Sequence, residues 1–307
     1  MSQPARLRIG SRGSDLALWQ ARHVQSCLKE PADIVVIKTR GDEIQHLSLD
    51  KVEGKGFFTK EIEAALLARE VDIAVHSYKD LPTEAVPGLL VAAVPARAPI
   101  EDVLVRRADA PSSAERWGLP HGARVGTSSL RRQAQLRSRR ADLELVMLRG
   151  NVPTRVGRVT SGELDAVVLA RAGLTRLGFI DGPRSTGLAV HTIPIDDVCP
   201  APAQGALAIQ VRADDAHAQR AVHVLHDELV ARCVTTERAL LRRFGGGCHL
   251  PLGASCSIAQ GELWLRALVA APDGHERLTA EARGVDPDHV ADDVHRQLVA
   301  AGAERYL

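Results

Sequence analysis

The chain has 307 residues, more than one average domain, which favours two or three domains. Hydrophobic residues make up 45% and charged residues 25%, the balance of an ordinary globular protein, so a disordered or collagen-like chain is excluded. The formal net charge of +1 provides no overall attraction to nucleic acid or to an anionic membrane.

The cysteines and the N-terminal residues favour a reduced, cytoplasmic protein. The start, MSQPARLRIG, lacks the apolar stretch of a signal peptide, and no run is long enough to span a bilayer. We therefore expect thiols rather than disulfides. No CxxC pair is present and the cysteines lack metal-ligand spacing, so we expect no metal site. The five cysteines are Cys27, Cys199, Cys233, Cys248 and Cys256.

Strand and helix patterns alternate through the first 80 residues. Strands are predicted at 7–10, 34–38 and 72–76, and helices at 15–29, capped by Ser14 or Asp15, and from the cap Thr59 onward. The β-branched run at 34–37 predicts a strand that is buried on both faces.

The middle of the chain repeats this alternation. Strands are predicted at 124–126, 143–148 and 166–170, each followed by a helix, which is typical of parallel α/β sheets. Proline-rich stretches at 95–99 and 194–202 flank this region and predict two chain crossings, as for a domain inserted into another. After the helix at 235–244, strands at 263–270 and 277–283 and a helix starting at Asp286 predict a small α+β domain.

The segment His76-Ser77-Tyr78-Lys79-Asp80 follows a predicted buried strand. Polar residues at the carboxyl end of a parallel strand lie where open α/β sheets bind ligands. A carboxylate beside a lysine can stay ionised there and stabilise a developing cation. The alternative is that Lys79 and Asp80 form a solvated pair in a loop.

Three further turns carry both arginines and hydrogen-bonding side chains before a helix. They are Arg12-Gly13-Ser14, the segment 126–132 (GTSSLRR) and the segment 149–155 (RGNVPTR). Helix starts bind anions, so these turns predict a polyanionic ligand, with carboxylates and phosphates equally suitable. The alternative is plain helix capping with exposed arginines.

Cys248 follows three glycines, which give backbone freedom and room for a bulky group on the sulfur. Nearby Arg242, Arg243 or a charged His249 would favour the reactive thiolate, although a buried structural cysteine is the alternative. Lys55 lies between glycines in EGKGFF, which indicates a mobile loop but lacks the spacing of an ATP-binding P-loop.

Taken together, these segments resemble the porphobilinogen deaminase family from about Arg8 to about Gly274. The matching blocks occur in one order and include RIGSRGSDLALWQA, GKGFFTKEIEAALL, DIAVHSYKDLP, GTSSLRRQAQL, LRGNVPTR, PAPAQGAL and ERALLRRFGGGCHLPLGA. The resemblance implies two α/β domains like the lobes of type II periplasmic binding proteins, plus a small C-terminal α+β domain. The expected bounds are 1–97 with 196–216, then 98–195, then 217–307.

The resemblance also implies the chemistry. One dipyrromethane per chain would be held by a thioether to Cys248, and four porphobilinogens would be joined with loss of ammonia, then released as the linear tetrapyrrole hydroxymethylbilane for haem biosynthesis. The enzyme would be a transferase and a cytoplasmic monomer that binds neither nucleic acid nor membrane.

Each expected role is placed on a residue that matches the family. Asp80 is the expected catalytic acid, opposite the cation left by ammonia. The expected cofactor residues are Cys248, Lys79, Ser77, Thr127, Ser128, Ser129, Arg131, Arg132, Lys55 and Gly150. The expected substrate residues are Arg12, Ser14, Arg149, Arg155, Arg176 and Gln204.

Departures from the family pattern are modest. Tyr78 stands where many relatives have Met, and Ala203 and Glu53 stand where Gly is usual. The main alternative function is a non-enzymatic, two-lobed carboxylate-binding protein. It would explain the arginines but would require neither Cys248 nor Asp80.

Overall fold

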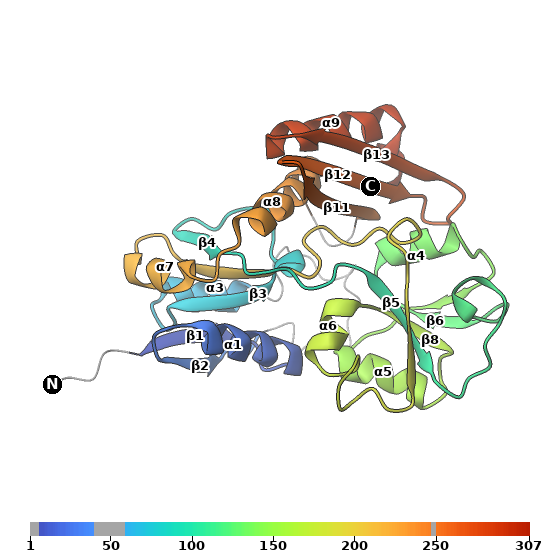
Figure 1. Ribbon diagram of the computed structural model, residues 1–307, viewed down its shortest axis with the longest axis horizontal. Coiled ribbons are helices and arrows are strands. Elements are labelled where there is room, and N and C mark those ends of the chain that lie inside the picture. The colour runs from blue at the N-terminus through green and yellow to red at the C-terminus, as the bar shows by residue number, and fades with distance from the viewer. Residues whose placement is uncertain (1–5, 40–58, 247–249) are drawn as a thin grey trace. The chain divides into compact units, whose positions relative to one another are not determined.

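The computed structural model describes residues 6–39, 59–246 and 250–307 (Figure 1). The chain forms two compact units, residues 1–98 with 206–232, and residues 99–205 with 233–307. Within the described residues, no helix combines the length and the apolar character needed to cross a membrane. The bounds expected for three domains stay a prediction.

The described residues of the first unit form a five-stranded sheet with helices on both faces. The strand order is β2-β1-β3-β10-β4, in which β1, β2 and β3 are parallel and β10 is antiparallel to both neighbours. Helices α1 and α7 pack on one face and α3 packs on the other. The elements are β1 (Leu7–Ser11), α1 (Asp15–Cys27), β2 (Ala32–Val36), α3 (Lys60–Leu67), β3 (Ile73–Ser77), the short 3-10 helix η2 (Tyr78–Asp80), β4 (Leu89–Ala93), β10 (Leu207–Arg212) and α7 (Ala216–His223).

One prediction for this unit is wrong. The strand with the β-branched run, β2, forms an edge of the sheet, and Val35 and Val36 are exposed. A β-branched run favours a strand but does not determine its place in the sheet. At the edge of a sheet, a strand need not be covered on both faces. Ser14 is confirmed as the cap of α1, whereas the Thr59 side chain makes no capping bond to α3.

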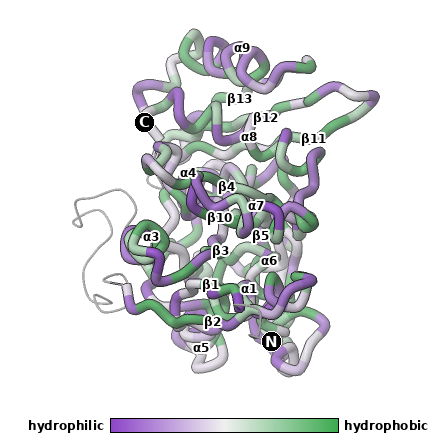
Figure 2. The backbone as a smooth tube through the Cα atoms, turned by 90° about the vertical axis from the view of Figure 1, so that its left-hand side faces the viewer, coloured by the Kyte–Doolittle hydropathy of each residue, from purple (hydrophilic) through white to green (hydrophobic). Residues whose placement is uncertain are grey.

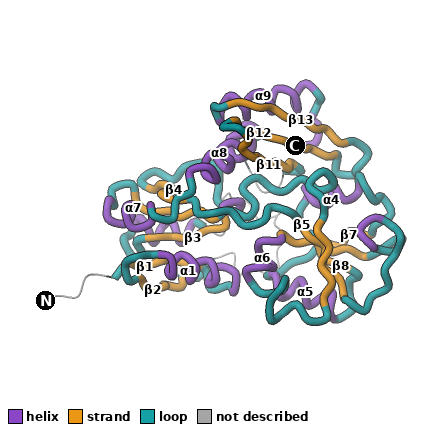
Figure 3. The backbone as a smooth tube through the Cα atoms, viewed as in Figure 1, coloured by secondary structure: helices purple, strands orange, loops and turns teal. Residues whose placement is uncertain are grey.

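The second unit contains a sheet with the same pattern, in the order β7-β6-β8-β5-β9. Here β6, β7 and β8 are parallel and β5 is antiparallel to β8 and β9. Helix α4 packs on one face and helices α5 and α6 pack on the other (Figure 3). The elements are β5 (Asp102–Arg107), η3 (Arg116–Gly118), β6 (Arg124–Gly126), α4 (Leu130–Arg137), β7 (Glu144–Val146), α5 (Val152–Thr160), β8 (Ala166–Ala170), α6 (Arg171–Arg176) and β9 (Leu188–Thr192).

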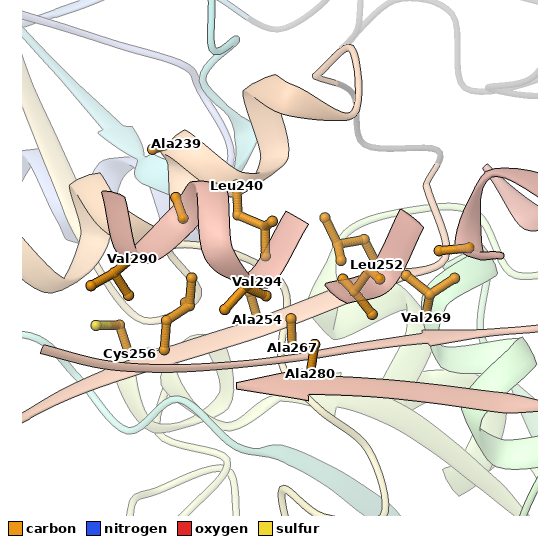
Figure 4. Packing of buried hydrophobic residues seen from close by; sticks show 14 of the residues in the cluster. Ala239, Leu240, Leu252, Ala254, Cys256, Ala267, Val269, Ala280, Val290 and Val294 are labelled. Atoms are coloured by element: carbon orange, nitrogen blue, oxygen red, sulfur yellow. The ribbon is translucent and has the colours of Figure 1, made fainter. Parts of the chain in front are cut away.

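The same unit includes a C-terminal three-stranded antiparallel sheet, β11-β12-β13, covered on one face by α8 and α9. Figure 4 shows Leu240 of α8 and Val290 and Val294 of α9 pointing onto this sheet. Helix α9 mixes hydrophobic and hydrophilic residues along its length (Figure 2), and its buried residues Val290, Val294 and Leu298 recur once per turn on one face. The elements are α8 (Glu228–Arg243), β11 (Leu252–Ala259), β12 (Glu262–Ala270), β13 (Arg277–Gly284), α9 (Pro287–Ala300) and η4 (Ala303–Tyr306). The predicted class, two α/β lobes and a small C-terminal α+β part, is confirmed.

The other face of the C-terminal sheet packs on the second lobe. Leu268 and Ala270 of β12 contact Ala134 of α4 and Cys199. Glu237 of α8 is fully buried, and its carboxylate accepts hydrogen bonds from the backbone N–H groups of Ala203 and Cys256, both at 2.7 Å. These contacts fix the loop before β10 from two sides.

Ala203 in that loop has a left-handed backbone, with φ of 63°. A Cβ atom makes this conformation costly by about 1–2 kcal/mol, and glycine adopts it without that cost. Alanine at position 203, where the family usually has glycine, therefore strains the backbone of this chain.

We predict that Ala203→Gly raises the free energy of unfolding by about 1 kcal/mol, because the relief of strain exceeds the extra entropy of glycine in the unfolded chain. Urea unfolding measures this change. The matched control is Ala208→Gly in the buried strand β10, which should lower stability. Equal destabilisation by both variants would contradict the strain at Ala203.

Candidate active site

In the first unit, two predicted site segments follow neighbouring parallel strands. Ile9 of β1 lies opposite Ile73 of β3, so Arg12 and Ser14 follow the same edge of the sheet as Ser77. This is the edge at which open α/β sheets bind ligands. The Ser14 hydroxyl accepts a hydrogen bond from the backbone N–H of Ala17 at 3.4 Å, which begins α1.

The segment after β3 forms the single turn η2. The backbone N–H of Tyr78 donates to the carbonyl of Ala206 at 3.0 Å, which ties the turn to the chain entering β10. Lys79 is half-buried and Asp80 is exposed. The backbone thus fixes the turn and leaves the Asp80 carboxylate accessible, and its catalytic role stays a prediction.

His76, just before this turn, is buried, with 6% of its surface exposed. Burial lowers its pKa to about 4, and the positive charge of Arg12 lowers it further. At neutral pH the imidazole is therefore uncharged. The positive charges of these segments then come from Arg12 and Lys79.

In the second unit, the parallel strands β6, β7 and β8 end at one edge of the sheet, as β1 and β3 do in the first unit. Gly126 at the end of β6 lies opposite Val146 of β7 and Val167 of β8. The segments 127–129 and 149–151 and helix α6 therefore all follow one edge of this sheet. The GTSSLRR and RGNVPTR turns therefore follow the ends of neighbouring strands, and binding of a ligand by them stays a prediction.

The three hydroxyls of the GTSSLRR turn brace the local backbone. Ser129 accepts from the N–H of Arg132 at 3.5 Å and caps α4. Ser128 accepts from the N–H of Leu148 at 3.1 Å and donates to the carbonyl of the same residue. Thr127 accepts from the N–H of Ser129 at 3.4 Å. These contacts match the capping alternative, and ligand binding by the three hydroxyls stays a prediction.

Arg131, Arg132 and Gln204 all donate to one buried carboxylate, that of Asp102. The distances from their nitrogens to the Asp102 oxygens are 2.8, 2.6 and 2.9 Å. Each also donates to a backbone carbonyl: Arg131 to Cys199 at 2.5 Å, Arg132 to Val168 at 3.2 Å and Gln204 to Ile100 at 2.7 Å. Asp102 itself has no exposed surface.

This cluster was not predicted from the sequence. Two buried guanidinium groups share one carboxylate, so the cluster of three charges is net positive by one. Burial lowers the pKa of Arg131, whereas the Asp102 charge opposes that shift. The two arginines are held within the lobe, and their contact with a cofactor stays a prediction.

Within the described residues of the second unit, two buried guanidinium nitrogens have no hydrogen-bond partner. They are Nε of Arg132 and one terminal nitrogen of Arg149. Buried donors are normally paired, so these N–H groups fit an anionic partner such as a carboxylate. They are the observation in this unit that best fits a cofactor or substrate with acidic side chains.

The turn after Arg149 depends on a glycine. Gly150 has φ of 99°, and a Cβ atom there would lie 2.9 Å from the Thr154 side chain. Nε of Arg155 donates to the Gly150 carbonyl at 2.8 Å. This contact directs Arg155 back to the start of α5.

Arg176, at the end of α6, donates to the Gly205 carbonyl at 2.8 Å. Burial lowers its pKa to about 10, so it remains charged at neutral pH. A partly desolvated cation of this kind binds an anion more strongly than an exposed one.

Lys55 and Cys248 lie outside the described residues. Of the other cysteines, Cys199, Cys233 and Cys256 are buried and Cys27 is exposed. Burial raises the pKa of Cys199 to about 12, which disfavours the reactive thiolate. Within the described residues, no group of three or more His, Cys, Asp or Glu side chains is placed to hold a metal ion.

Sequence comparison identifies the family. Residues 7–220 match the family model described as porphobilinogen deaminase, dipyromethane cofactor binding domain, and residues 231–300 match that of the porphobilinogen deaminase C-terminal domain. The chain belongs to the porphobilinogen deaminase family. The porphobilinogen deaminase of Pelobacter propionicus is 44% identical, covering 99% of this chain and 97% of that protein. That of Helicobacter hepaticus is 44% identical, covering 89% and 83%, respectively.

These relatives do not favour the alternative of a carboxylate-binding protein. Solved structures similar to this porphobilinogen deaminase family member include a periplasmic VFT2 domain of BvgS from Bordetella pertussis, with a TM-score of 0.41 and 14% identity over 71% of this chain and 84% of that chain. Another is the aliphatic sulphonate binding protein SsuA from Escherichia coli, with a TM-score of 0.39 and 15% identity over 79% and 71%.

We predict that Asp102→Asn lowers the free energy of unfolding by about 3–5 kcal/mol, because it leaves two buried guanidinium groups without their countercharge. Urea unfolding measures the loss. Asp33→Asn is the control, since Asp33 pairs with Arg6 on the surface and should contribute at most about 1 kcal/mol. Similar small losses for both variants would contradict the assigned role of Asp102.

Proposed function

We propose that this chain is a transferase that condenses four porphobilinogen molecules on a covalent primer, with loss of four ammonia molecules. One water molecule then hydrolyses the bond to the primer and releases the linear tetrapyrrole hydroxymethylbilane. Membership of the porphobilinogen deaminase family carries this proposal. The partnerless buried guanidinium nitrogens of Arg132 and Arg149 support it, because every pyrrole of the substrate and product bears an acetate and a propionate.

The proposed cofactor is one dipyrromethane per chain, joined by a thioether to Cys248. When bound, it supplies the pyrrole carbon that acts as the nucleophile and starts the chain. The residues proposed to hold its carboxylates and ring N–H groups are Lys55, Ser77, Lys79, Thr127, Ser128, Ser129, Arg131, Arg132 and Gly150.

Arg12, Ser14, Arg149, Arg155, Arg176 and Gln204 are proposed to bind substrate. Their role is to neutralise and orient the carboxylates of porphobilinogen. Arg176 suits this role because it is a partly desolvated cation that stays charged at neutral pH. Gln204 has an amide held by Asp102 and Ile100, so it would position the loop as much as it would bind a ligand.

Asp80 is proposed to stabilise the cation that forms as ammonia leaves the aminomethyl carbon of porphobilinogen. The positive charge is shared with the pyrrole nitrogen, and a carboxylate that accepts the pyrrole N–H lowers its energy. The position of Asp80 on the backbone-fixed turn η2 supports this role, because a carboxylate held in place before the reaction requires little reorganisation.

We also infer that the chain acts as a monomer in the cytoplasm and binds neither nucleic acid nor membrane. The near-zero net charge supports the absence of these polyanionic partners. Size-exclusion chromatography with light scattering tests the monomer, and a dimer mass would overturn it.

Incubation of the purified chain with porphobilinogen tests the proposed activity. We expect one ammonia released for each porphobilinogen consumed. The product should cyclise with loss of water to a porphyrinogen, which an added oxidant converts to a coloured porphyrin. Stable porphobilinogen in the presence of chain that carries the cofactor would overturn the proposal.

We predict that Asp80→Asn keeps the fold and loses about 10²–10³-fold in kcat, because the amide has the same shape but lacks the charge that faces the cation. Steady-state kinetics and thermal unfolding are measured together. Asp109→Asn, which changes another exposed carboxylate, serves as the control and should leave kcat unchanged. A kcat of Asp80→Asn near that of the unmodified chain would exclude the assigned role.

A further inference from the structure

Gln20 is a polar residue on the buried face of α1. Only 2% of its surface is exposed, and its buried neighbours on the helix are Ala21 and Val24. An amide in such surroundings is costly unless it is hydrogen-bonded. The Gln20 amide nitrogen meets this requirement by donating to the Ser77 hydroxyl oxygen at 2.8 Å.

The direction of this hydrogen bond has a chemical consequence. An amide nitrogen can only donate, so the Ser77 oxygen is the acceptor and its own proton is not used in the contact. The hydroxyl therefore keeps its proton for a second acceptor. Ser77 ends β3 and immediately precedes the turn with Lys79 and Asp80.

We propose that Gln20 is a positioning residue that makes the Ser77 hydroxyl a hydrogen-bond donor toward a carboxylate of the pyrrole ligand. This inference rests on the proposed function, in which Ser77 helps to hold the cofactor. A hydroxyl can present either a proton or a lone pair, and only the proton attracts an anion. The hydrogen bond from Gln20 orients the Ser77 hydroxyl before the ligand binds, so the ligand does not have to reorient it.

Two variants of Gln20 separate this role from simple packing. Gln20→Met has a similar volume but no donor, which leaves the Ser77 hydroxyl unoriented. Gln20→Glu, assayed at a pH at which the buried carboxyl group is ionised, replaces the donor by an acceptor, so the Ser77 proton turns toward position 20 and lone pairs face the ligand. The proposal therefore expects Gln20→Glu to be the more harmful, although it also retains a hydrogen bond to Ser77.

Gln25 provides a matched control on the same helix. Its amide nitrogen donates to the Ala32 carbonyl at 2.7 Å, which joins α1 to β2 and does not involve Ser77. Gln25→Met removes a hydrogen bond of the same kind from the same helix. It should change thermal stability without changing ligand binding.

The experiment uses the full chain produced without cofactor and loaded with porphobilinogen. Intact mass spectrometry gives the porphobilinogen concentration at which half of the chain carries the covalent adduct. We expect this concentration to rise about 3- to 10-fold in Gln20→Met and more than about 10-fold in Gln20→Glu, and to stay unchanged in Gln25→Met. In a Ser77→Ala background, Gln20→Met should have no further effect, because its only route to the ligand has been removed.

Three results would overturn the role of Gln20 while the unmodified chain loads normally. They are unchanged loading of both Gln20 variants, an equal loss in Gln25→Met, or the same loss from Gln20→Met with and without Ser77. An unmodified chain that never acquires the adduct would instead overturn the proposed function, and with it this inference.

Discussion

The carboxylate of Asp102 is the contact on which the second lobe most depends. It is fully buried at the start of β5 and accepts hydrogen bonds from two arginines of α4 and from Gln204 in the loop before β10. A buried carboxylate surrounded by these donors holds helix, strand and loop in one arrangement, and removal of Asp102 would leave two buried guanidinium groups without their countercharge. The cluster remains net positive, so it also contributes a cationic field at the carboxyl edge of the sheet.

The first lobe positions its site differently, with backbone contacts and neutral hydrogen bonds. The turn after β3 is fixed by the Ala206 carbonyl, and Ser77 is held by Gln20 from the core face of α1. His76 stays uncharged because of burial, so the positive charges of these segments come from Arg12, which follows β1, and from Lys79, which lies on the same turn as Asp80. In the proposed reaction, in which a polyanionic substrate briefly becomes an electrophilic cation, both the cations and the carboxylate of these segments would have a use.

Local patterns predicted much of this arrangement. The strand ends and helix starts at Ser14, at Ser129 and at Pro153 follow from capping and from the φ of proline, which act within a few residues. Asp102 and Gln20 carried no such signal, because their partners are 29 to 102 and 57 residues away, respectively. The sequence also did not predict the exposure of β2, because the order of strands in a sheet depends on pairing between distant residues.

The proposed function depends on a covalent pyrrolic primer on Cys248, and the intact mass of the purified protein is the most direct test for it. After incubation with porphobilinogen, the unmodified chain should show an excess over the sequence mass equal to one dipyrromethane. Cys27→Ala, which removes an exposed thiol, should keep that excess, and Cys248→Ala should lose it. An excess mass that persists on Cys248→Ala would contradict attachment of the primer at Cys248, and no excess on the unmodified chain would contradict the presence of a covalent primer.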